Sequence, residues 1–296
     1  MPRMEKRSAR ILAFVLALIM IGSVFAYVMR GGTQNKREVK EIFSDFRDYI
    51  NITPKSAYLI EYVNLSYLYL NKDDPLREYI DHKLRNILRP EIFSRSIISF
   101  PNGFRSIVLA YCYDTVQSYF YFVDTNLSKV YFAYNSELKI GNYTVKVRPG
   151  IALLDEISPV VVGYIKPVSD VVEILEGNET GLSEYHKYLS RINGSFLYAW
   201  YTYGDYAKST IKANNSSMAD FFFEGYRFNE TNKSYEKVWA LHFIGNYFFA
   251  KTNKTEYCYI RSYDDGFSVA VLGDKNFTKL MKTNPRILTY QIKIGS

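Results

Sequence analysis

The longest run of apolar positions in the chain covers residues 11–29, nineteen residues that include no charged side chain. At about 1.5 Å per residue, a helix of this length spans roughly 28 Å, close to the hydrocarbon thickness of a bilayer. Residues 1–10 carry four basic side chains and one acidic side chain. Because basic flanks stay in the cytoplasm, the pattern predicts a cytoplasmic flank at 1–10 and a single-pass signal-anchor helix at 11–29. The remainder of the chain is then an extracellular ectodomain held at the cell membrane.

Two other interpretations of the N-terminus stay open. A cleaved secretory signal would use residues 11–21 as its apolar region, with cleavage after the segment Val24 to Ala26. The anchor is favoured over this signal because the apolar run continues past Ala26 to Met29. In the second interpretation, the segment Arg7 to Ala9 resembles the prepilin-type processing site of archaeal pilin-like subunits, which implies a surface assembly subunit.

Beyond the apolar run, Gly31 and Gly32 interrupt the helix, and apolar side chains then recur at helical spacing. Such spacing is typical of an amphipathic helix with one solvated face. Residues 30–50 are therefore predicted to form a juxtamembrane amphipathic helix, or stalk. The apolar positions that carry this prediction are Val39, Ile42, Phe43, Phe46, Tyr49 and Ile50.

From residue 51 onward, short runs rich in Tyr, Phe, Val and Ile alternate with turn residues, which is typical of antiparallel strands. The clearest hairpin joins 219–228 to 235–244 through a polar loop. The fold class predicted is α+β, with a mainly antiparallel β-rich ectodomain and a few short helices. Strands are predicted at 57–63, 96–100, 105–113, 118–124, 129–134, 143–148, 159–164, 196–203, 219–228, 235–244, 246–251, 256–262, 267–272 and 287–293.

The predicted helices are short, and the first has clear boundary residues. Asp74 is placed to cap it, Pro75 occupies its first position and Pro90 stops it. The other helices are predicted at 167–176, 183–192 and 274–283.

A repeated pattern suggests that the ectodomain consists of two similar halves. Residues 159–175 and residues 267–281 each read as a strand, a glycine and a helix. Small and polar residues cluster near 176–182, where a boundary between halves would fall. The ectodomain is therefore predicted to divide into an α+β half at 51–177 and a second at 178–296.

Twelve Asn-x-Ser/Thr sequons follow the apolar run, and none precedes it. With 19 Asn and 38 Ser or Thr among 296 residues, chance would give about 2.4 such sequons. An acceptor must be exposed on the side of the membrane where glycan is transferred, which agrees with the orientation predicted from charge. The glycosylation candidates are Asn51, Asn64, Asn126, Asn142, Asn178, Asn193, Asn214, Asn215, Asn229, Asn232, Asn253 and Asn276.

The formal charge of +7 is concentrated beside the apolar run, where five of the 37 basic residues and one of the 30 acidic residues lie. Residues 31–296 therefore hold 32 basic and 29 acidic residues, a net charge of +3. A nucleic-acid binder would carry a basic stripe on its folded part, so no nucleic-acid partner is expected. The expected partners are the lipid bilayer, through residues 11–29, and an envelope protein or a carbohydrate.

Aromatic residues make up 17% of the chain, with 28 Tyr and 20 Phe. In segments 118–123 and 198–203 they fall on both faces of predicted strands. One interpretation is an aromatic surface that stacks on sugar rings or packs against a neighbouring subunit. The other, which is favoured, is a two-sided core whose tyrosine hydroxyls reach solvent.

Side chains suited to catalysis or metal binding are scarce. His82, His186 and His242 fall in helix or strand patterns, and the paired spacing typical of zinc ligands is missing from the sequence. The aspartate pairs at 73–74 and 264–265 are interpreted as turn or cap residues rather than calcium ligands. No catalytic, metal-binding or cofactor-binding residue is therefore assigned, and no cofactor is expected.

The chain has two cysteines, Cys112 and Cys258, each in a Tyr-Cys-Tyr segment of a predicted strand. A disulfide between them and a pair of buried thiols both stay open. An animal ectodomain with this many sequons would carry several disulfides, so the combination suggests an archaeal surface protein.

The expected function is that of a single-pass membrane-anchored, N-glycosylated cell-surface protein with a non-catalytic structural or binding ectodomain. A secreted or pilin-like subunit and, third, an extracellular hydrolase are the alternatives, and the oligomeric state is left open.

Overall fold

The computed structural model describes residues 39–101, 103–125, 130–213 and 215–290. The predicted membrane span at 11–29 lies outside these residues, as do the predicted cytoplasmic flank and the first part of the predicted stalk. Within the described ranges, no helix is both long enough and apolar enough to cross a bilayer.

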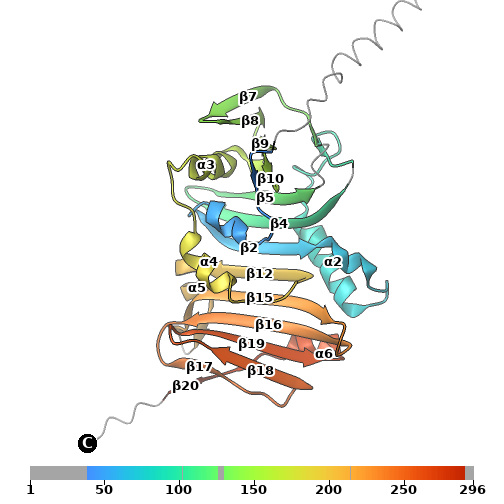
Figure 1. Ribbon diagram of the computed structural model, residues 1–296, viewed down its shortest axis with the longest axis vertical. Helices are drawn as coiled ribbons and strands as arrows, with labels where there is room; N and C mark the ends of the chain where they lie inside the picture. Colours follow the sequence, from blue (N-terminus) through green and yellow to red (C-terminus); the bar gives the residue numbers. More distant parts are fainter. Residues whose placement is uncertain (1–38, 102, 126–129, 214, 291–296) are drawn as a thin grey trace, which may run out of the picture. The chain divides into compact units, whose positions relative to one another are not determined.

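The main element of the described chain is a twelve-stranded sheet in which every neighbouring pair of strands is antiparallel (Figure 1). Its strands are β2 (Ala57–Asn64), β4 (Phe104–Tyr113), β5 (Gln117–Thr125), β7 (Ser136–Ile140), β8 (Tyr143–Arg148), β9 (Ile151–Leu154), β11 (Val160–Tyr164), β12 (Tyr198–Tyr203), β15 (Ala219–Asn229), β16 (Ser234–Phe243), β18 (Tyr257–Ser262) and β19 (Phe267–Asp274). The order across the sheet is β18-β19-β16-β15-β12-β2-β4-β5-β11-β9-β8-β7. The prediction of a β-rich, mainly antiparallel fold with few short helices is confirmed.

Smaller elements surround this sheet. The two-stranded ladders pair β1 (Glu41–Ile42) with β10 (Ile157–Ser158), β3 (Ile98–Ser99) with β6 (Tyr131–Phe132), β13 (Lys212–Ala213) with β14 (Ser216–Ser217), and β17 (Tyr247–Ala250) with β20 (Arg286–Thr289). The helices are η1 (Asp48–Ile52), η2 (Leu65–Tyr69), α2 (Pro75–Ile87), α3 (Ile165–Leu175), η3 (Ser183–Tyr185), α4 (His186–Leu189), α5 (Gly204–Thr210) and α6 (Phe277–Lys282).

Both faces of the sheet are covered, which produces two principal cores. On the first face, α3 packs Val168 and Val171 in one cluster with Phe120 of β5, and η1 and α4 join the same cluster. On the second face, α2 and α6 pack against the other side of the same strands, with Leu76 and Phe277 buried. Because both faces are buried, the strands need aromatic or aliphatic side chains at consecutive positions.

This two-sided core accounts for much of the tyrosine content, although the hydroxyls do not reach solvent as expected. Tyr121 donates to the carbonyl of Ile87 at 2.7 Å, and Tyr198 donates to the Glu61 carboxylate at 2.8 Å. Both tyrosine side chains are fully buried. These two hydroxyls therefore form hydrogen bonds inside the protein, as most buried polar groups do.

The boundaries predicted for the first helix are confirmed in α2. The Asp74 carboxylate accepts a hydrogen bond from the backbone N–H of Leu76 at 2.8 Å, and Pro75 is the first helical residue. The cap satisfies a backbone donor that would otherwise have no helical partner.

The amphipathic helix predicted up to residue 50 is wrong over its described part. Residues 41–42 form β1, which pairs with β10, and only the 3-10 helix η1 follows, from Asp48. Phe46 stacks on Tyr62 with ring centroids 4.1 Å apart. Phe46, Tyr49 and Ile50, which suggested a helix, instead belong to the first core, so tertiary packing overrides the local spacing. This segment is part of the first core rather than a solvated stalk.

The strands on the two sides of the centre follow the same order. Starting from β12, the sheet continues through β15 and β16 to β19, the last strand of this sheet in the chain, and then to β18, which precedes it in the chain. Starting from β2, it continues through β4 and β5 to β11, the last strand of this sheet before β12 in the chain, and then to β9, which precedes β11. A helix follows each last strand, but α3 packs on the first face and α6 on the second.

Candidate functional site

A pocket with a cavity volume of about 850 Å³ opens where the two central strands meet. The first residues of β2 and the last residues of β12 share one edge of the sheet because these strands are antiparallel. Helices η3, α4 and α5 lie along this edge, on the left in Figure 1. Five tyrosines contribute to the pocket lining: Tyr58, Tyr113, Tyr185, Tyr203 and Tyr206. We call this the tyrosine pocket.

The tyrosines of the pocket differ in exposure, and the differences define its shape. Tyr203 is 4% exposed, whereas Tyr206 is 40% exposed and Tyr113 is 65% exposed. Tyr203 therefore belongs to the closed end, and the other two belong to the rim. Tyr185 stacks on Tyr203 with centroids 4.9 Å apart, and Tyr58 lies 4.6 Å from Tyr206. These contacts hold the rings in fixed orientations.

Polar groups accompany the rings. Lys55 and Glu184 are exposed lining residues, and neither has an ion-pair partner among the described residues. Gln117 donates from Nε2 to the Tyr58 hydroxyl at 3.3 Å. The lining thus offers a free ammonium group, a free carboxylate and an amide beside aromatic faces.

The hydroxyl of Tyr203 is buried and has no hydrogen-bond partner within the described part of the chain. Burial raises the pKa of Tyr203 well above its usual value. Burial, followed by the nearby Glu184 carboxylate, raises the pKa of Tyr185 to about 12. Both phenols are therefore neutral hydrogen-bond donors at physiological pH.

A second pocket of about 700 Å³ lies at the opposite end of β2. Its wall includes the Arg105–Asp124 ion pair at 2.7 Å and the side chain of Arg47. It also includes Asn64, one of the sequon acceptors. A glycan on Asn64 would occupy this space, whereas no residue lining the tyrosine pocket is an acceptor. The tyrosine pocket is therefore the stronger candidate for a binding site.

The acceptor asparagines lie at the surface wherever the structure describes them. Asn126 and Asn214 lie outside the described residues. Seven of the other ten are exposed, namely Asn142, Asn178, Asn193, Asn215, Asn232, Asn253 and Asn276. The remaining three are half-buried, namely Asn51, Asn64 and Asn229. Thus none of the ten described acceptors is buried, as attachment of a glycan requires.

Five acceptors gather at the edge of the sheet opposite the tyrosine pocket. Each lies at, or within a few residues of, the end of a central strand, where antiparallel pairing brings these ends together. They are Asn64 after β2, Asn193 before β12, Asn229 after β15, Asn232 before β16 and Asn276 after β19.

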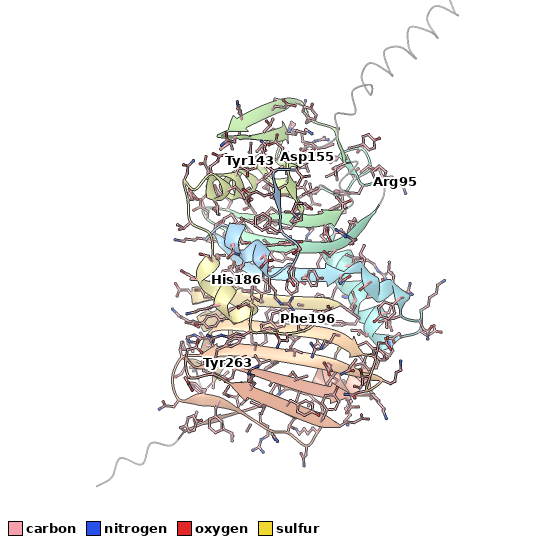
Figure 2. All side chains as sticks on the ribbon, in the orientation of Figure 1. Arg95, Tyr143, Asp155, His186, Phe196 and Tyr263 are labelled. Atoms are coloured by element: carbon pink, nitrogen blue, oxygen red, sulfur yellow. The ribbon has the colours of Figure 1, made fainter. Side chains whose placement is uncertain are left out.

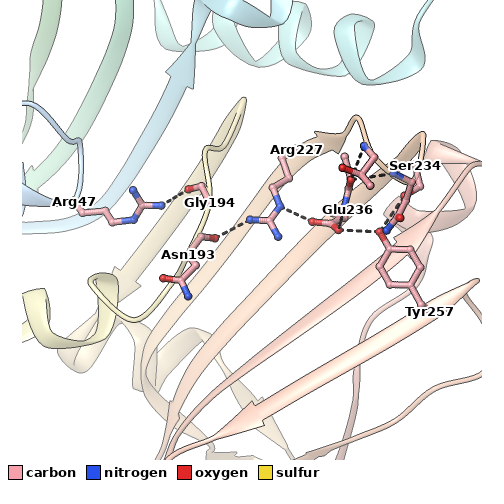
Figure 3. Close-up of polar contacts among 10 residues, drawn as sticks. Arg47, Asn193, Gly194, Arg227, Ser234, Glu236 and Tyr257 are labelled. Atoms are coloured by element: carbon pink, nitrogen blue, oxygen red, sulfur yellow. Dashed lines mark hydrogen bonds and ion pairs between the residues drawn. The ribbon is translucent and has the colours of Figure 1, made fainter.

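The Asn193 sequon is held in place through its backbone (Figure 3). Arg227 donates to the carbonyl oxygen of Asn193 at 2.7 Å, and Arg47 donates to that of Gly194. Gly194 has φ of +99°, and a Cβ there would lie 1.8 Å from the Arg227 guanidinium. Only glycine fits this position. The Asn193 side chain itself is exposed and makes no hydrogen bond within the described chain.

Arg227 also contacts Glu236, a carboxylate that is 5% exposed (Figure 3). Glu236 accepts hydrogen bonds from Asn229 Nδ2 and from the Tyr257 hydroxyl, each at 2.8 Å. Burial alone would raise the pKa of Glu236, but the Asn229, Arg227 and Tyr257 contacts outweigh it and hold the pKa below its ordinary value.

A carboxylate whose pKa is lowered by folding stabilises the protein above its unfolded pKa, about 4.3 for Glu, and this contribution is lost as pH falls through the folded pKa. We therefore expect the free energy of unfolding to fall below about pH 4.3. In Glu236→Gln, which cannot ionise, this acid dependence should be smaller. Urea titrations at several pH values between neutral and acidic measure the slope of the free energy of unfolding against pH. An unchanged slope in the variant would show that Glu236 does not contribute.

The Asn229 amide has a structural role that competes with glycosylation. Its Nδ2, the atom that would carry a glycan, donates to the buried Glu236 carboxylate. Asn253 is exposed and makes no side-chain hydrogen bond within the described residues. We expect mass spectrometry of intact glycopeptides to find glycan on Asn253 and none on Asn229. A glycan on Asn229 in folded native material would contradict this assignment.

The structure does not bring Cys112 and Cys258 together. Both are free, with Cys112 on β4 and Cys258 on β18. Five strands lie between β4 and β18, so six interstrand steps separate them, which corresponds to roughly 29 Å at about 4.8 Å per step. A disulfide requires Cα atoms within about 7 Å, so the two residues cannot be bridged within one chain. The two Tyr-Cys-Tyr segments also occupy different kinds of position, since β4 is an inner strand of the sheet and β18 is an outermost one.

The three histidines have separate local roles. His82 is exposed on α2, and His186 on α4 (labelled in Figure 2) contacts Asp48 with 3.1 Å between Nε2 and Oδ1. Both ring nitrogens of His242 are engaged, Nδ1 with Asp220 and Nε2 with the carbonyl of Asp265. No group of His, Cys, Asp and Glu side chains that could hold a metal is found in the residues that the structure describes.

Comparisons with known proteins find a full-length archaeal relative. An uncharacterized protein of Archaeoglobus fulgidus is 50% identical over 301 residues, which cover 99% of this chain and 97% of the relative. The model of the AF_2048_N family N-terminal domain matches residues 42–176. Among solved structures, crystal form I of TP0453 aligns with a TM-score of 0.40 and 11% identity over 78% of this chain and 95% of that chain. Crystal form IV aligns with a TM-score of 0.35 and 8% identity, over 79% and 96%.

Proposed function

We propose that this chain, which belongs to the family of its Archaeoglobus fulgidus relative, is a membrane-anchored, N-glycosylated surface protein of archaea whose ectodomain binds a ligand. In this proposal residues 11–29 cross the cell membrane with the N-terminus in the cytoplasm. The tyrosine pocket is the binding site of the extracellular part.

The surface location of the acceptors carries this proposal. A chance distribution would give about 2.4 sequons, and the twelve that occur all follow the apolar run. None of the ten described acceptors is buried, and one of their loops is fixed by Arg47 and Arg227 so that Asn193 stays free. The full-length archaeal relative is consistent with the source suggested by many sequons and few cysteines.

The distribution of acceptors supports a binding role in addition to a structural one. Five acceptors lie at one edge of the central strands, and the tyrosine pocket lies at the other. Glycans at the first edge would therefore leave the pocket open. A concave site of about 850 Å³ with aromatic walls and a few polar groups has the size and composition of ligand pockets.

We further infer that the ectodomain arose from two similar halves, near the predicted boundary at residue 177. The repeated strand order on either side of β2 and β12 supports this inference, as does the family match that ends at residue 176. The tyrosine pocket takes residues from both halves, for example Tyr58 and Tyr206.

Two measurements on native cells test the proposed function. Protease treatment of intact cells should remove the carboxyl-terminal part while sparing residues before the apolar run. Glycopeptide analysis of the same material should find modified sequons. An ectodomain that resists protease until the cells are lysed, together with unmodified asparagine at every sequon, would overturn the proposal.

A further inference from the structure

We propose that the tyrosine pocket binds a neutral pyranose sugar, with Tyr206 and Tyr58 as the stacking surface and Glu184 and Gln117 as hydrogen-bonding groups. This inference rests on the proposed function, because it names the ligand class of the site assigned there.

The aromatic geometry carries the first step of the argument. A pyranose ring presents an apolar C–H face that packs against the electron-rich face of an aromatic ring. Tyr206 is 40% exposed at the rim, and Tyr58 lies beside it with ring centroids 4.6 Å apart and planes tilted by 49°. Both rings line the tyrosine pocket and contact each other there. Exposed rings in a pocket, unlike those in a core, are available to a ligand.

The polar groups carry the second step. Sugar hydroxyls both donate and accept, so they are recognised by groups of both kinds placed around the ring. Glu184 supplies an acceptor, and the Gln117 amide and the neutral tyrosine hydroxyls supply donors as well as acceptors. The Glu184 carboxylate has no ion-pair partner in the described chain, so its oxygens are free for a ligand.

The charge of the lining favours a neutral ligand over an anionic one. Lys55 is the one basic side chain in the lining, and Glu184 and Asp205 oppose it. A phosphate, sulfate or nucleotide site would need an excess of arginine or lysine donors. An acyl chain would need an apolar enclosure, whereas this rim carries carboxylate, ammonium and hydroxyl groups. A neutral polyhydroxylated ring is compatible with all of these features.

Two sources can supply such a sugar. One is a glycan on a neighbouring copy of this chain, since five of the ten described acceptors lie at the edge of the sheet opposite the pocket of their own copy. The other is a polysaccharide from outside. The chemistry recognised by the pocket is the same in both cases, so the source is decided by experiment.

The test measures binding to full-length protein purified in detergent, using two probes. The first probe is the set of glycans released from the protein itself, and the second is a pair of neutral oligosaccharides, cellohexaose and mannohexaose. We expect at least one probe to give saturation-transfer signals in NMR and a measurable affinity in calorimetry. Binding of the first probe identifies a neighbouring copy as the source, and binding of the second alone identifies an outside polysaccharide.

Matched variants show whether the binding occurs in this pocket. Tyr206→Ala should weaken binding about tenfold because it removes a stacking face. Tyr206→Phe keeps the ring and should retain most of the affinity. Tyr259→Ala is the control, since Tyr259 is 63% exposed on β18 and does not line the pocket. Equal melting temperatures for the variants would show that all of them fold.

Two outcomes would overturn the inference. One is that neither probe binds. The other is that binding is the same in Tyr206→Ala as in the control variant. Neither outcome affects the proposed function, which depends on glycopeptides and protease accessibility rather than on a sugar ligand.

Discussion

Replacing Glu224 by alanine is expected to lower the free energy of unfolding by about 3–5 kcal/mol, because it removes the carboxylate paired with a buried ammonium group and the acceptor shared by three hydrogen-bond donors. Glu224 accepts hydrogen bonds from the indole N–H groups of Trp200 and Trp239 and from the Tyr226 hydroxyl. The Lys237 ammonium group lies 3.6 Å from the same carboxylate, and the Lys237 side chain is 3% exposed.

These contacts follow from strand register. Glu61, Trp200, Glu224 and Trp239 face one another in turn across β2, β12, β15 and β16. Carboxylates thus alternate with indoles in a row across the centre of the sheet. A single carboxylate can accept several hydrogen bonds, which explains how one side chain satisfies so many neighbours.

The measurement is chemical denaturation followed by tryptophan fluorescence, since the chain has two tryptophans and both contact Glu224. Glu78 on α2 provides the control, because it is exposed and makes no ion pair within the described residues. Glu78→Ala should change stability by no more than about 0.5 kcal/mol. Similar values for the two variants would show that the carboxylate row contributes little.

The second large effect is expected for Gly163→Ala, which should lower the free energy of unfolding by about 3 kcal/mol because the added methyl group overpacks the site. A Cβ on Gly163 would lie 2.4 Å from the Cα of Phe120 and 2.6 Å from the carbonyl oxygen of Tyr119. Both atoms belong to the backbone of β5, which is paired on both sides and cannot withdraw.

Gly273, the glycine of the second strand-glycine-helix pattern, serves as the matched comparison. A Cβ there would lie 1.9 Å from the ring of Tyr257, a side chain on the edge strand β18. The Tyr257 ring can rotate away from the added Cβ, but its hydroxyl would then lose the hydrogen bond to Glu236. Gly273→Ala should therefore lower the free energy of unfolding by about 1–2 kcal/mol. Thermal unfolding of both variants tests the ranking, and a larger loss at Gly273 would contradict it.

Elements with strong local signals were predictable from the sequence. The Asp74 cap and Pro75 place α2, and the polar loop between two aromatic-rich runs places the hairpin of β15 and β16. In each case the residues that set the boundary are adjacent in the chain, so no knowledge of distant contacts is needed.

Elements whose conformation depends on distant partners were not predictable. Residues 41–50 have helical spacing, yet β1 pairs with β10, more than a hundred residues away in sequence. β7 was missed because four of its five residues are exposed and lack an apolar alternation, and β9 was missed because all four residues are buried. Short strands of these two kinds have no periodic signal.

The tyrosine pocket also could not be predicted from the sequence. Its residues come from four separate segments, which include Tyr58, Tyr113, Tyr185 and Tyr206. The signal available was the 17% aromatic content, for which an aromatic surface was one interpretation and a two-sided core the favoured one. The content could not place such a surface, because placement depends on the antiparallel neighbours β2 and β12.

The outermost strands of the sheet, β18 and β7, each have a sheet neighbour on one side only. The unpaired backbone groups of such edge strands can pair with strands from other molecules, which leads to fibres. On β7, Glu137 and Lys139 are exposed, and on β18 Arg261 is exposed. An incoming chain would have to strip water from these charges at an energetic cost. The charged side chains on these edge strands therefore disfavour polymerisation of the folded chain, even where many copies are crowded together.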